Sequence, residues 1–511
     1  MKQFFKILFH RLSIVSILLV IQLLIFISIV FRFEQYFIYF YVVCTILSLI
    51  TVLHILNSNS NPSYKIAWLI PILAIPIFGV TFYIIFGKNH LSDRAKRKMQ
   101  TIYEKMKPNL QSNEKVKKEL EKDNKDAYLQ SNYIEKYACY PVYNKTQTEY
   151  LASGEEYFSK LKEELKQAKH YIFIESFIIE QGVMWNSILD ILIQKVRENV
   201  EVRVIYDDLG CITKLPYKYN EKLEKLGIKV AVFNPFIPIL TSRFNNRDHR
   251  KIIVIDGFIG FTGGINLADE YINVYPKYGH WKDTGILLKG EAVWSFTVSF
   301  LSIWDYIKNK EENYEKYRPQ IHQEHHFKTD GFVQPYSDSP LDEEGIGENI
   351  YMNLICKAKD YIYITTPYLI IDNEMVSALR LAAKNGVDVR IITPHIPDKW
   401  YVHTVTRAYY ETLLNAGVKI YEYEKGFIHS KTFVVDDLYA TVGTVNLDYR
   451  SLYLHFECGT WLYNTKSVYT IKDDFYKTLT ESKTITIKMC KKINPLRKLG
   501  RAILRIFAPL M

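Results

Sequence analysis

The chain has 511 residues, a length that accommodates a membrane region followed by two domain-sized halves. Its formal net charge of +10, from 65 Lys+Arg against 55 Asp+Glu, suits an anionic surface, either a membrane or a nucleic acid. The 6 cysteines are scattered without a Cys-x-x-Cys pair, so a disulfide framework and a cysteine zinc site are both disfavoured.

Residues 1–87 contain three apolar stretches, at 12–31, 36–56 and 66–86. Each is long enough to span a bilayer, which predicts a multi-pass protein of the cell membrane. Lys and Arg residues at the start of the chain and just after the third stretch favour the cytoplasm for both ends, and so for the domains that follow. Three full crossings cannot satisfy both ends. The third stretch, interrupted by Pro71 and Pro76, is therefore expected to be a re-entrant or interfacial hairpin.

After a charged linker and helix at 88–135, strand and helix patterns alternate in two successive halves, 136–330 and 331–490. Helical patterns at 185–198 and 373–385 separate the first two strands of each half. This order predicts an α/β fold of two pseudo-symmetric halves, each with a mixed, mostly parallel sheet layered by helices. The first three strands of each half are expected at 170–179, 201–207 and 227–233, and at 361–370, 388–393 and 417–423.

A fourth strand in each half carries the same polar signature. The first copy comprises His249-Arg250-Lys251, four apolar residues, Asp256 and Gly263-Gly264-Ile265-Asn266; the second comprises His429-Ser430-Lys431, four residues, Asp436 and Gly443-Thr444-Val445-Asn446. His429 lies 180 positions after His249, and every other matching residue keeps that offset. A pattern of this length, repeated in register, indicates a duplicated functional element rather than two unrelated surface strands.

The residue types of the signature suit chemistry on a phosphodiester. Positions i and i+2 of a strand face the same side, so each histidine would point together with the lysine two residues later. One imidazole can attack phosphorus while the other protonates the leaving alcohol. Gly264 and Thr444 would let backbone approach a ligand closely, and Lys251, Lys431, Asn266 and Asn446 would neutralise the phosphate. We therefore expect no metal and no cofactor.

The doubled signature resembles the phospholipase D superfamily, and the surrounding segments resemble the bacterial cardiolipin synthase family. His455 stands where this family would be expected to have Asn, and Cys211 stands where Ser is usual. The segments that carry the closer resemblance are Ala67-Trp68-Leu69, Phe86-Gly87, Trp281-Lys282-Asp283-Thr284, Thr366-Pro367-Tyr368, Gly386-Val387-Asp388-Val389-Arg390, Gly417-Val418-Lys419-Ile420 and Asn446-Leu447-Asp448-Tyr449-Arg450-Ser451.

The resemblance implies two phospholipase D-type halves and phosphatidyl transfer between two phosphatidylglycerol molecules, giving cardiolipin and glycerol. It implies His249 as nucleophile and His429 as general acid, with Asp256 and Asp436 supporting the structure or orienting the histidines. Phosphatidylglycerol, cardiolipin and an anionic lipid surface are the expected partners, and nucleic acid is not. The alternatives are a hydrolase, either a lipid-cleaving phospholipase D or a tethered nuclease, and a non-catalytic scaffold, which the two intact signatures disfavour.

The C-terminal residues 491–511 have the pattern of a basic amphipathic helix. Apolar residues recur at helical spacing while Arg497, Lys498, Arg501 and Arg505 occupy the opposite face. This pattern is typical of a helix that lies at a membrane surface. The alternative is a helix docked on the catalytic halves.

Overall fold

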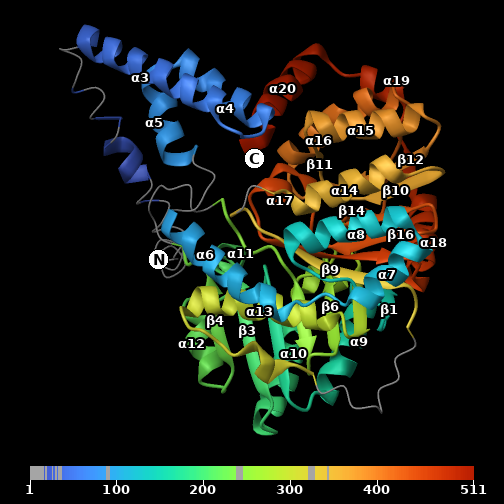
Figure 1. Ribbon diagram of the computed structural model, residues 1–511. Helices are drawn as coiled ribbons and strands as arrows, with labels where there is room; N and C mark the ends of the chain where they lie inside the picture. Colours follow the sequence, from blue (N-terminus) through green and yellow to red (C-terminus); the bar gives the residue numbers. More distant parts are fainter. Residues whose placement is uncertain are drawn as a thin grey trace.

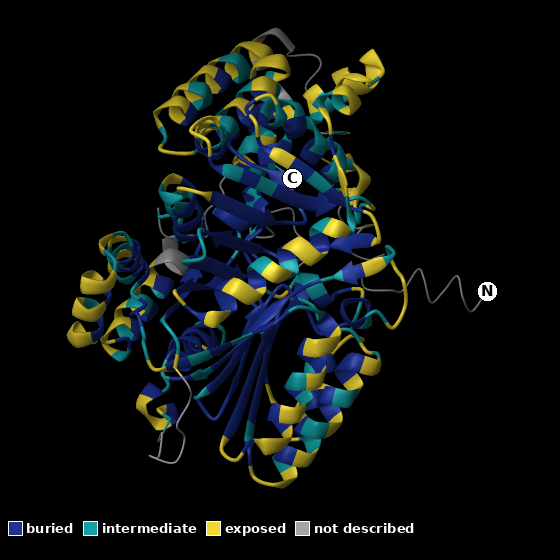
Figure 2. Ribbon diagram, turned by 90° about the vertical axis from the view of Figure 1, so that its right-hand side faces the viewer, coloured by how far each residue is buried: buried dark blue, intermediate teal, exposed yellow. Residues whose placement is uncertain are grey.

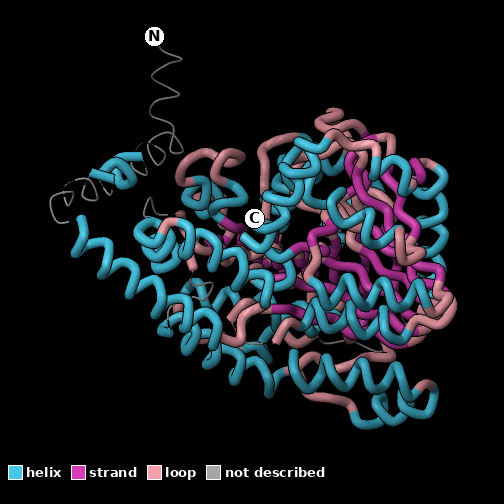
Figure 3. Tube along the Cα trace, turned by 90° about the horizontal axis from the view of Figure 1, so that it is seen from above, coloured by secondary structure: helices cyan, strands magenta, loops and turns pink. Residues whose placement is uncertain are grey.

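The computed structural model describes residues 17, 20–25, 27–28, 32, 37–87, 93–236, 245–319, 329–341 and 344–510. Its main body consists of two mixed β-sheets, each covered by helices (Figure 1). Figure 3 shows the strands gathered in the interior with helices around them, and an N-terminal helical unit projecting from one side.

The first sheet has seven strands in the order β1-β8-β6-β5-β2-β3-β4. Its strands are buried along most of their length (Figure 2), as the apolar runs of the sequence predict. The strands are β1 (Thr146–Leu151), β2 (Tyr171–Ser176), β3 (Glu201–Asp207), β4 (Lys229–Phe233), β5 (Ile252–Ile255), β6 (Ile259–Gly263) and β8 (Gly285–Gly290).

The second sheet repeats this arrangement, with the order β9-β18-β16-β15-β10-β12-β13 and an additional edge strand, β19. Strand by strand it matches the first sheet, which is the structural expression of the duplicated signature. The strands are β9 (Phe332–Asp338), β10 (Tyr361–Thr365), β12 (Asp388–Pro394), β13 (Lys419–Tyr423), β15 (Thr432–Val435), β16 (Tyr439–Gly443), β18 (Glu457–Tyr463) and β19 (Ser482–Thr484).

The prediction of mostly parallel sheets is wrong. Within the two sheets only the pairings β2–β3, β3–β4, β10–β12 and β12–β13 are parallel. The remaining pairings of these sheets are antiparallel. The strand after each signature returns through a short turn, at 256–258 and 436–438. A turn of this length can join only antiparallel strands, because parallel neighbours need a long crossover.

Helices layer both sheets and tie the two halves together. The helix that closes each half, α13 or α18, contacts its own sheet and also the edge strand of the other half, β9 or β1. Thirteen of the sixteen residues of α13 are buried, which explains its almost continuous apolar sequence. The main covering helices are α9 (Gly154–Gln167), α10 (Val183–Arg197), α13 (Val293–Lys308), α14 (Ile346–Lys357), α15 (Asn373–Lys384), α16 (Trp400–Leu414) and α18 (Lys466–Thr480).

In its described part, the stretch expected to be a charged linker and helix forms α6 (Asp93–Met106), α7 (Glu114–Asp123) and α8 (Lys125–Ala138). These helices pack on the main body through apolar side chains such as Met99, Leu120 and Ile134. Their contacts reach α13 of the first half and α14 and β9 of the second. The segment is therefore a brace across both halves. The domain boundaries at 135/136 and 330/331 stay a prediction.

The N-terminal unit consists of α3 (Phe37–Asn57), α4 (Pro62–Ala74) and α5 (Pro76–Phe86), packed around Trp68 and Ile72. The first apolar stretch lies mostly outside the described residues. The third is not one segment, because the chain leaves helical geometry at Ile75, directly before Pro76. The resulting helices of 13 and 11 residues are much shorter than the roughly 20 residues that a membrane crossing requires.

Among the residues that the structure describes, no helix combines the length and the apolar character needed to cross a membrane.

The C-terminal segment forms α19 (Ile487–Lys491), α20 (Pro495–Ile506) and a final 3₁₀ turn, η6 (Ala508–Leu510). Helix α20 contacts α16 and α4, and Leu510 packs on the apolar cluster of the N-terminal unit. The C-terminus therefore lies against α4, as Figure 1 shows.

Candidate active site

Backbone pairing between the halves positions the second signature. The short strand β7 (His280–Lys282) of the first half pairs in parallel with β14 (Gly426–Ile428) of the second, and the last matched residues are Lys282 and Ile428. The next residues along the two strands are Asp283 and His429. The backbone N–H of His429 donates to the carbonyl of Lys282 over 2.7 Å, which holds these two side chains next to each other.

The first signature is positioned in the same way, with the histidine now in the first half and its partner segment in the second. Asp248 and Phe456 form a parallel bridge between the halves, and the N–H of His249 donates to the carbonyl of Phe456 over 2.9 Å. The residues that follow the bridge are His249 and Glu457. Each signature histidine is thus the neighbour, in register, of a carboxylate from the other half.

Both histidines use Nδ1 to bind their carboxylate. Nδ1 of His429 lies 2.6 Å from Oδ2 of Asp283, and Nδ1 of His249 lies 2.9 and 3.0 Å from the two oxygens of Glu457. Since a carboxylate accepts hydrogen bonds, it favours the tautomer with the proton on Nδ1. That tautomer leaves the lone pair of Nε2 free for reaction with a substrate.

The sequence analysis did not assign a role to Asp283, which it used only as part of a matching segment. Asp283 and Glu457 each lie two residues before the glycine that pairs with the last residue of the signature hairpin, Gly285 with Gly263 and Gly459 with Gly443. An acidic residue at that equivalent place in both halves is the signal that could have identified the pair.

The signature lysines lie beside the histidine backbone. Nζ of Lys251 donates to the carbonyl of His249 over 2.6 Å, while Nζ of Lys431 donates to the carbonyl of His429 and lies 2.9 Å from Nδ1 of its ring. Burial lowers the pKa of Lys251 to about 8 and that of Lys431 to about 7. The two ammonium groups are therefore held in a site that favours their pairing with an anion.

Burial and the nearby lysines also keep the histidines neutral. The pKa of His249 is lowered well below its usual value, first by burial and then by the charges of Lys251 and Lys431. Burial and Lys431 lower the pKa of His429 to about 4, against the opposing effect of Asp283. Burial would raise the pKa of Asp283, but His429 and Lys431 lower it on balance. Because charges from both signatures act on His249, the two signatures meet in one site.

The glycine and threonine of the signatures serve the carboxylates. A Cβ atom on Gly264 would lie 2.1 Å from Oδ1 of Asp283, so only glycine leaves room for this acid. In the second half, the hydroxyl of Thr444 donates to the carboxylate of Glu457. Gly264 was expected to let the backbone approach a ligand. In the structure the group that lies close to Gly264 is the carboxylate of Asp283.

The signature asparagines differ in their surroundings. The side chain of Asn266 accepts from the N–H of Ile178 over 3.0 Å and donates to the hydroxyl of Tyr271 over 2.6 Å. Oδ1 of Asn446 is buried without a hydrogen-bond partner among the described residues. The two equivalent positions therefore supply different amides. Neighbouring groups orient Asn266, whereas the side-chain oxygen of Asn446 can still accept a hydrogen bond.

Asp256 and Asp436 bind backbone and not the histidines. The carboxylate of Asp256 accepts from the N–H groups of Lys169, His170 and Tyr171, at 2.7–2.9 Å. The carboxylate of Asp436 accepts in the same way from residues 359–361, at 2.7–3.0 Å. Each aspartate fixes the start of the strand next to its own signature, β2 or β10.

The fold and the paired histidines define the class of this protein: two halves of phospholipase D type that share one site. Phosphatidylserine synthase of Haemophilus influenzae has a similar fold, with a TM-score of 0.54 and 15% sequence identity over 71% of this chain and 94% of that chain. A family model described as "Cardiolipin synthase, PLD-like domain" matches residues 161–278 and 351–479. A second, "Phospholipase_D-nuclease N-terminal", matches residues 46–88, and it indicates membrane association.

The chain belongs to the cardiolipin synthase family, whose members are phosphatidyltransferases within the phospholipase D superfamily. A protein of Alkalihalophilus pseudofirmus named cardiolipin synthase is 36% identical over 89% of this chain and 90% of its own length. A Streptococcus mutans protein named only as uncharacterized is 44% identical over 90% of this chain and 99% of its own length. The resemblance predicted from the doubled signature is confirmed.

Replacing the paired acids tests whether they set the histidine tautomers. We expect Asp283→Asn and Glu457→Gln each to lower kcat by about 10²–10⁴-fold, because an amide no longer selects the Nδ1–H tautomer. Circular dichroism should show folded protein in both cases. Glu422→Gln is the matched control, since Glu422 also binds a histidine, His395, at 2.9 Å but lies outside the site. A kcat within threefold of the original chain for either site variant would contradict the assignment.

Proposed function

We propose that the chain transfers a phosphatidyl group from one phosphatidylglycerol to the hydroxyl of another, giving cardiolipin and glycerol. The observation that carries this proposal is the pair of histidine–carboxylate couples that meet in one site, one from each signature. Membership of the cardiolipin synthase family supports the choice of lipid substrates.

In the first step, Nε2 of His249 attacks phosphorus and the bond from phosphorus to the glycerol oxygen breaks. The imidazole gains positive charge as it forms the phosphorus–nitrogen bond, and the Glu457 carboxylate on Nδ1 stabilises that charge. His429 gives its Nε2 proton to the departing glycerol oxygen. The product of this step is a phosphatidyl-histidine together with free glycerol.

In the second step, the hydroxyl of another phosphatidylglycerol gives its proton to His429 and attacks the same phosphorus. The phosphorus–nitrogen bond breaks, which restores neutral His249 and releases cardiolipin. Lys251, Lys431, Asn266 and Asn446 stabilise the charge of the non-bridging oxygens in both steps. The overall transfer is reversible, because the two steps together exchange one phosphorus–oxygen ester bond for another.

Substrate binding supplies the protonation state that the first step needs. In the free site His429 is neutral at physiological pH, since its pKa is about 4. A bound phosphodiester places negative charge beside the imidazole and raises its pKa. His249, held against Glu457 by Nδ1, keeps the Nε2 lone pair with which it attacks.

We further propose that the catalytic halves lie on the cytoplasmic face of the cell membrane, with the N-terminal unit and α20 in contact with lipid. Helix α3 exposes apolar side chains around most of its surface, with Val42, Ile46, Ile50 and Leu53 each 51–60% exposed. Apolar surface on this scale is stable only in contact with lipid or another protein.

Helix α20 supports the same placement by its orientation. Two of its basic side chains contact the protein, since the Arg505 guanidinium lies 4.5 Å from the centre of the Tyr409 ring and Arg501 is half-buried near Arg407. Arg497 and Lys498 are exposed. Its apolar side chains Leu499 and Ile503 are 59% and 48% exposed. A helix docked on a soluble domain would bury the apolar face, so this arrangement favours a lipid surface.

Product analysis tests the proposed reaction. We expect labelled phosphatidylglycerol in detergent to give cardiolipin and glycerol in equal amounts, and His249→Ala and His429→Ala each to abolish turnover without unfolding. Mapping of a trapped phosphatidyl-enzyme at neutral to alkaline pH, where the phosphorus–nitrogen bond survives, should place the label on His249. Phosphatidic acid as the main product would show that water is the acceptor, and label on His429 would reverse the two roles.

Cysteine labelling tests the cytoplasmic orientation. With the native cysteines replaced, Lys310→Cys introduces a thiol at an exposed position after α13. We expect a membrane-impermeant maleimide to label this thiol only after the cells are permeabilised. Labelling of intact cells would place the catalytic halves outside.

Substitution of the exposed face of α20 tests its contact with lipid. We expect Leu499→Ser with Ile503→Ser to lower kcat/KM on phosphatidylglycerol vesicles by about tenfold, because two apolar side chains no longer enter the bilayer surface. Turnover of a short-chain, water-soluble phosphatidylglycerol should stay unchanged. Leu129→Ser is the matched control, since Leu129 is an exposed leucine on α8. Equal losses in the double variant and the control would contradict a specific role for α20.

A further inference from the structure

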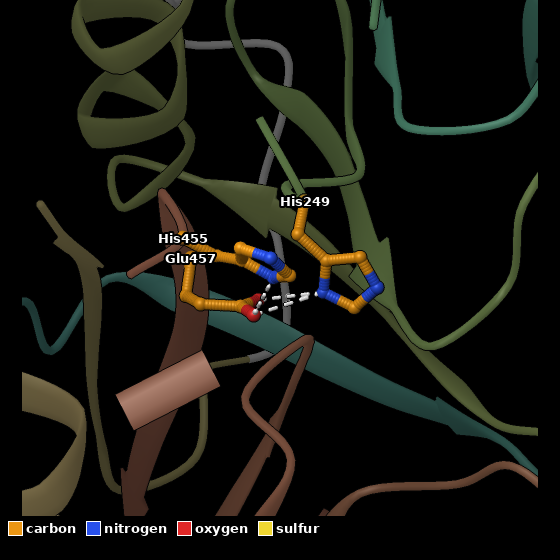
Figure 4. A group of neighbouring side chains, drawn as sticks. All are labelled: His249, His455 and Glu457. Carbon is orange, nitrogen blue, oxygen red and sulfur yellow. Dashed lines mark hydrogen bonds and ion pairs between the residues drawn. The ribbon is translucent and has the colours of Figure 1, made fainter. Parts of the chain in front are cut away.

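We propose that His249, His455 and Glu457 form a binding site for a transition-metal ion of the Zn²⁺ type, and that the bound ion inhibits the enzyme. Figure 4 shows the His455 ring next to the Glu457 carboxylate, with the His249 ring approaching from the opposite side of the site. The potential ligand atoms of the three residues all lie within 4.8 Å of one another. Two imidazoles and one carboxylate are a ligand set that zinc uses in proteins, with a fourth position left for water.

The distances between the potential ligand atoms lie just below and just above the separation that a tetrahedral metal centre requires. Nδ1 of His249 lies 2.9 Å from Oε1 of Glu457, and Nδ1 of His455 lies 3.8 Å from the same oxygen. A tetrahedral ion with bonds of about 2.0–2.1 Å separates its ligand atoms by about 3.3 Å. Side-chain rotations that move the ring nitrogens by about an ångström would complete the coordination, with the backbone left in place.

His455 gives the second, independent indication of a ligand. Both of its ring nitrogens are buried without a hydrogen-bond partner among the described residues, and its side chain is 10% exposed. A buried imidazole without a partner is costly, and a bound ion would satisfy it.

The charges around the cluster also admit a cation. Two buried lysines, Lys251 and Lys431, are balanced by two buried carboxylates, Glu457 and Asp283. The position of His455 is one where this family would be expected to have asparagine. The ligand set is therefore a property of this chain, added next to a site that otherwise follows the family pattern.

A second group with the same residue types lacks this capacity. Glu422 lies 2.9 Å from Nδ1 of His395 and 3.8 Å from Nε2 of His403, much as Glu457 lies between its two histidines. However, Arg407 binds both oxygens of Glu422, at 2.6 and 2.7 Å. The guanidinium already neutralises the carboxylate, so a divalent ion has no free anionic ligand there. This group provides a matched control.

The bound ion would inhibit by changing the tautomer of His249. Coordination takes the lone pair of Nδ1 and displaces the proton that Nδ1 shares with Glu457. The neutral ring then carries its proton on Nε2, so Nε2 has no lone pair with which to attack phosphorus. This consequence rests on the proposed role of His249 as nucleophile, whereas the binding of the ion does not.

Titration with Co²⁺ tests binding without reference to activity. Full-length protein in detergent, with any polyhistidine tag removed, is titrated with Co²⁺ and followed by visible absorption, which is intense for tetrahedral cobalt. We expect one equivalent to bind and Zn²⁺ to displace it. His455→Asn and His455→Gln should each weaken binding at least about tenfold, because one of the three ligands is lost.

Two control variants separate the metal site from the active site. His403→Asn alters the matched group and should leave the cobalt spectrum unchanged. His429→Ala should abolish turnover and still bind Co²⁺, because His429 is not a ligand. The cobalt spectrum of His429→Ala should be retained even if the proposed phosphatidyl transfer is wrong. The proposed metal site and the proposed reaction can therefore fail separately.

Inhibition is measured as a ratio within each variant, phosphatidylglycerol turnover in saturating Zn²⁺ divided by turnover in chelator. We expect a ratio below about 0.1 for the original chain and for His403→Asn, and above about 0.5 for His455→Asn. The proposal is overturned if Co²⁺ gives no tetrahedral spectrum at millimolar concentration, or if His455→Asn binds Co²⁺ as tightly as the original chain. Equal ratios for His455→Asn and the original chain would refute the inhibitory role.

Discussion

The hydrogen bond from each signature histidine to a carboxylate of the opposite half is the interaction on which the site depends. It selects the tautomer of the imidazole and fixes the direction of its reactive nitrogen. Because both bonds cross between the halves, neither half contains a complete histidine–carboxylate pair. The contact between the halves is for this reason part of the candidate active site as well as a packing interface.

Several features of the fold serve that contact. The parallel pairing of β7 with β14 and the bridge from Asp248 to Phe456 bring each acid into register with its histidine. Strands β6, β16 and β18 meet directly behind the site, where the hydroxyl of Thr262 lies 3.4 Å from the thiol of Cys458. Helices α13 and α18 reach the edge strand of the opposite sheet. A shift of one half against the other would break both pairs together.

The concentration of buried charge in the site has a cost that the surrounding fold must offset. Two lysines and two carboxylates are held with the histidines in a volume from which water is largely excluded, and the pKa values of the lysines fall accordingly. The same arrangement would let the two ammonium groups pair with the anionic phosphodiester of the proposed substrate. His455 extends it with a ring whose nitrogens have no hydrogen-bond partner among the described residues and whose Nδ1 lies 3.8 Å from the Glu457 carboxylate.

The sequence by itself determined the duplicated signature, the family and the strands nearest the signature. The strand predicted at 201–207 coincides with β3, and the apolar runs after His249-x-Lys251 and His429-x-Lys431 coincide with β5 and β15. These features depend on local pattern and spacing, which a sequence displays directly. Strand direction was not predicted correctly, because the hairpins of β5–β6 and β15–β16 depend on turns and long-range pairing. The sheets proved mainly antiparallel.

Only the tertiary structure decided which acid belongs to which histidine, because Asp283 and Glu457 are far in sequence from the residues they bind. It also decided that Asp256 and Asp436 fix strands, that the charged segment after residue 92 braces both halves, and that α20 turns its apolar face outward. Each of these depends on which surfaces meet when the chain folds, and such contacts leave no periodic trace in the sequence.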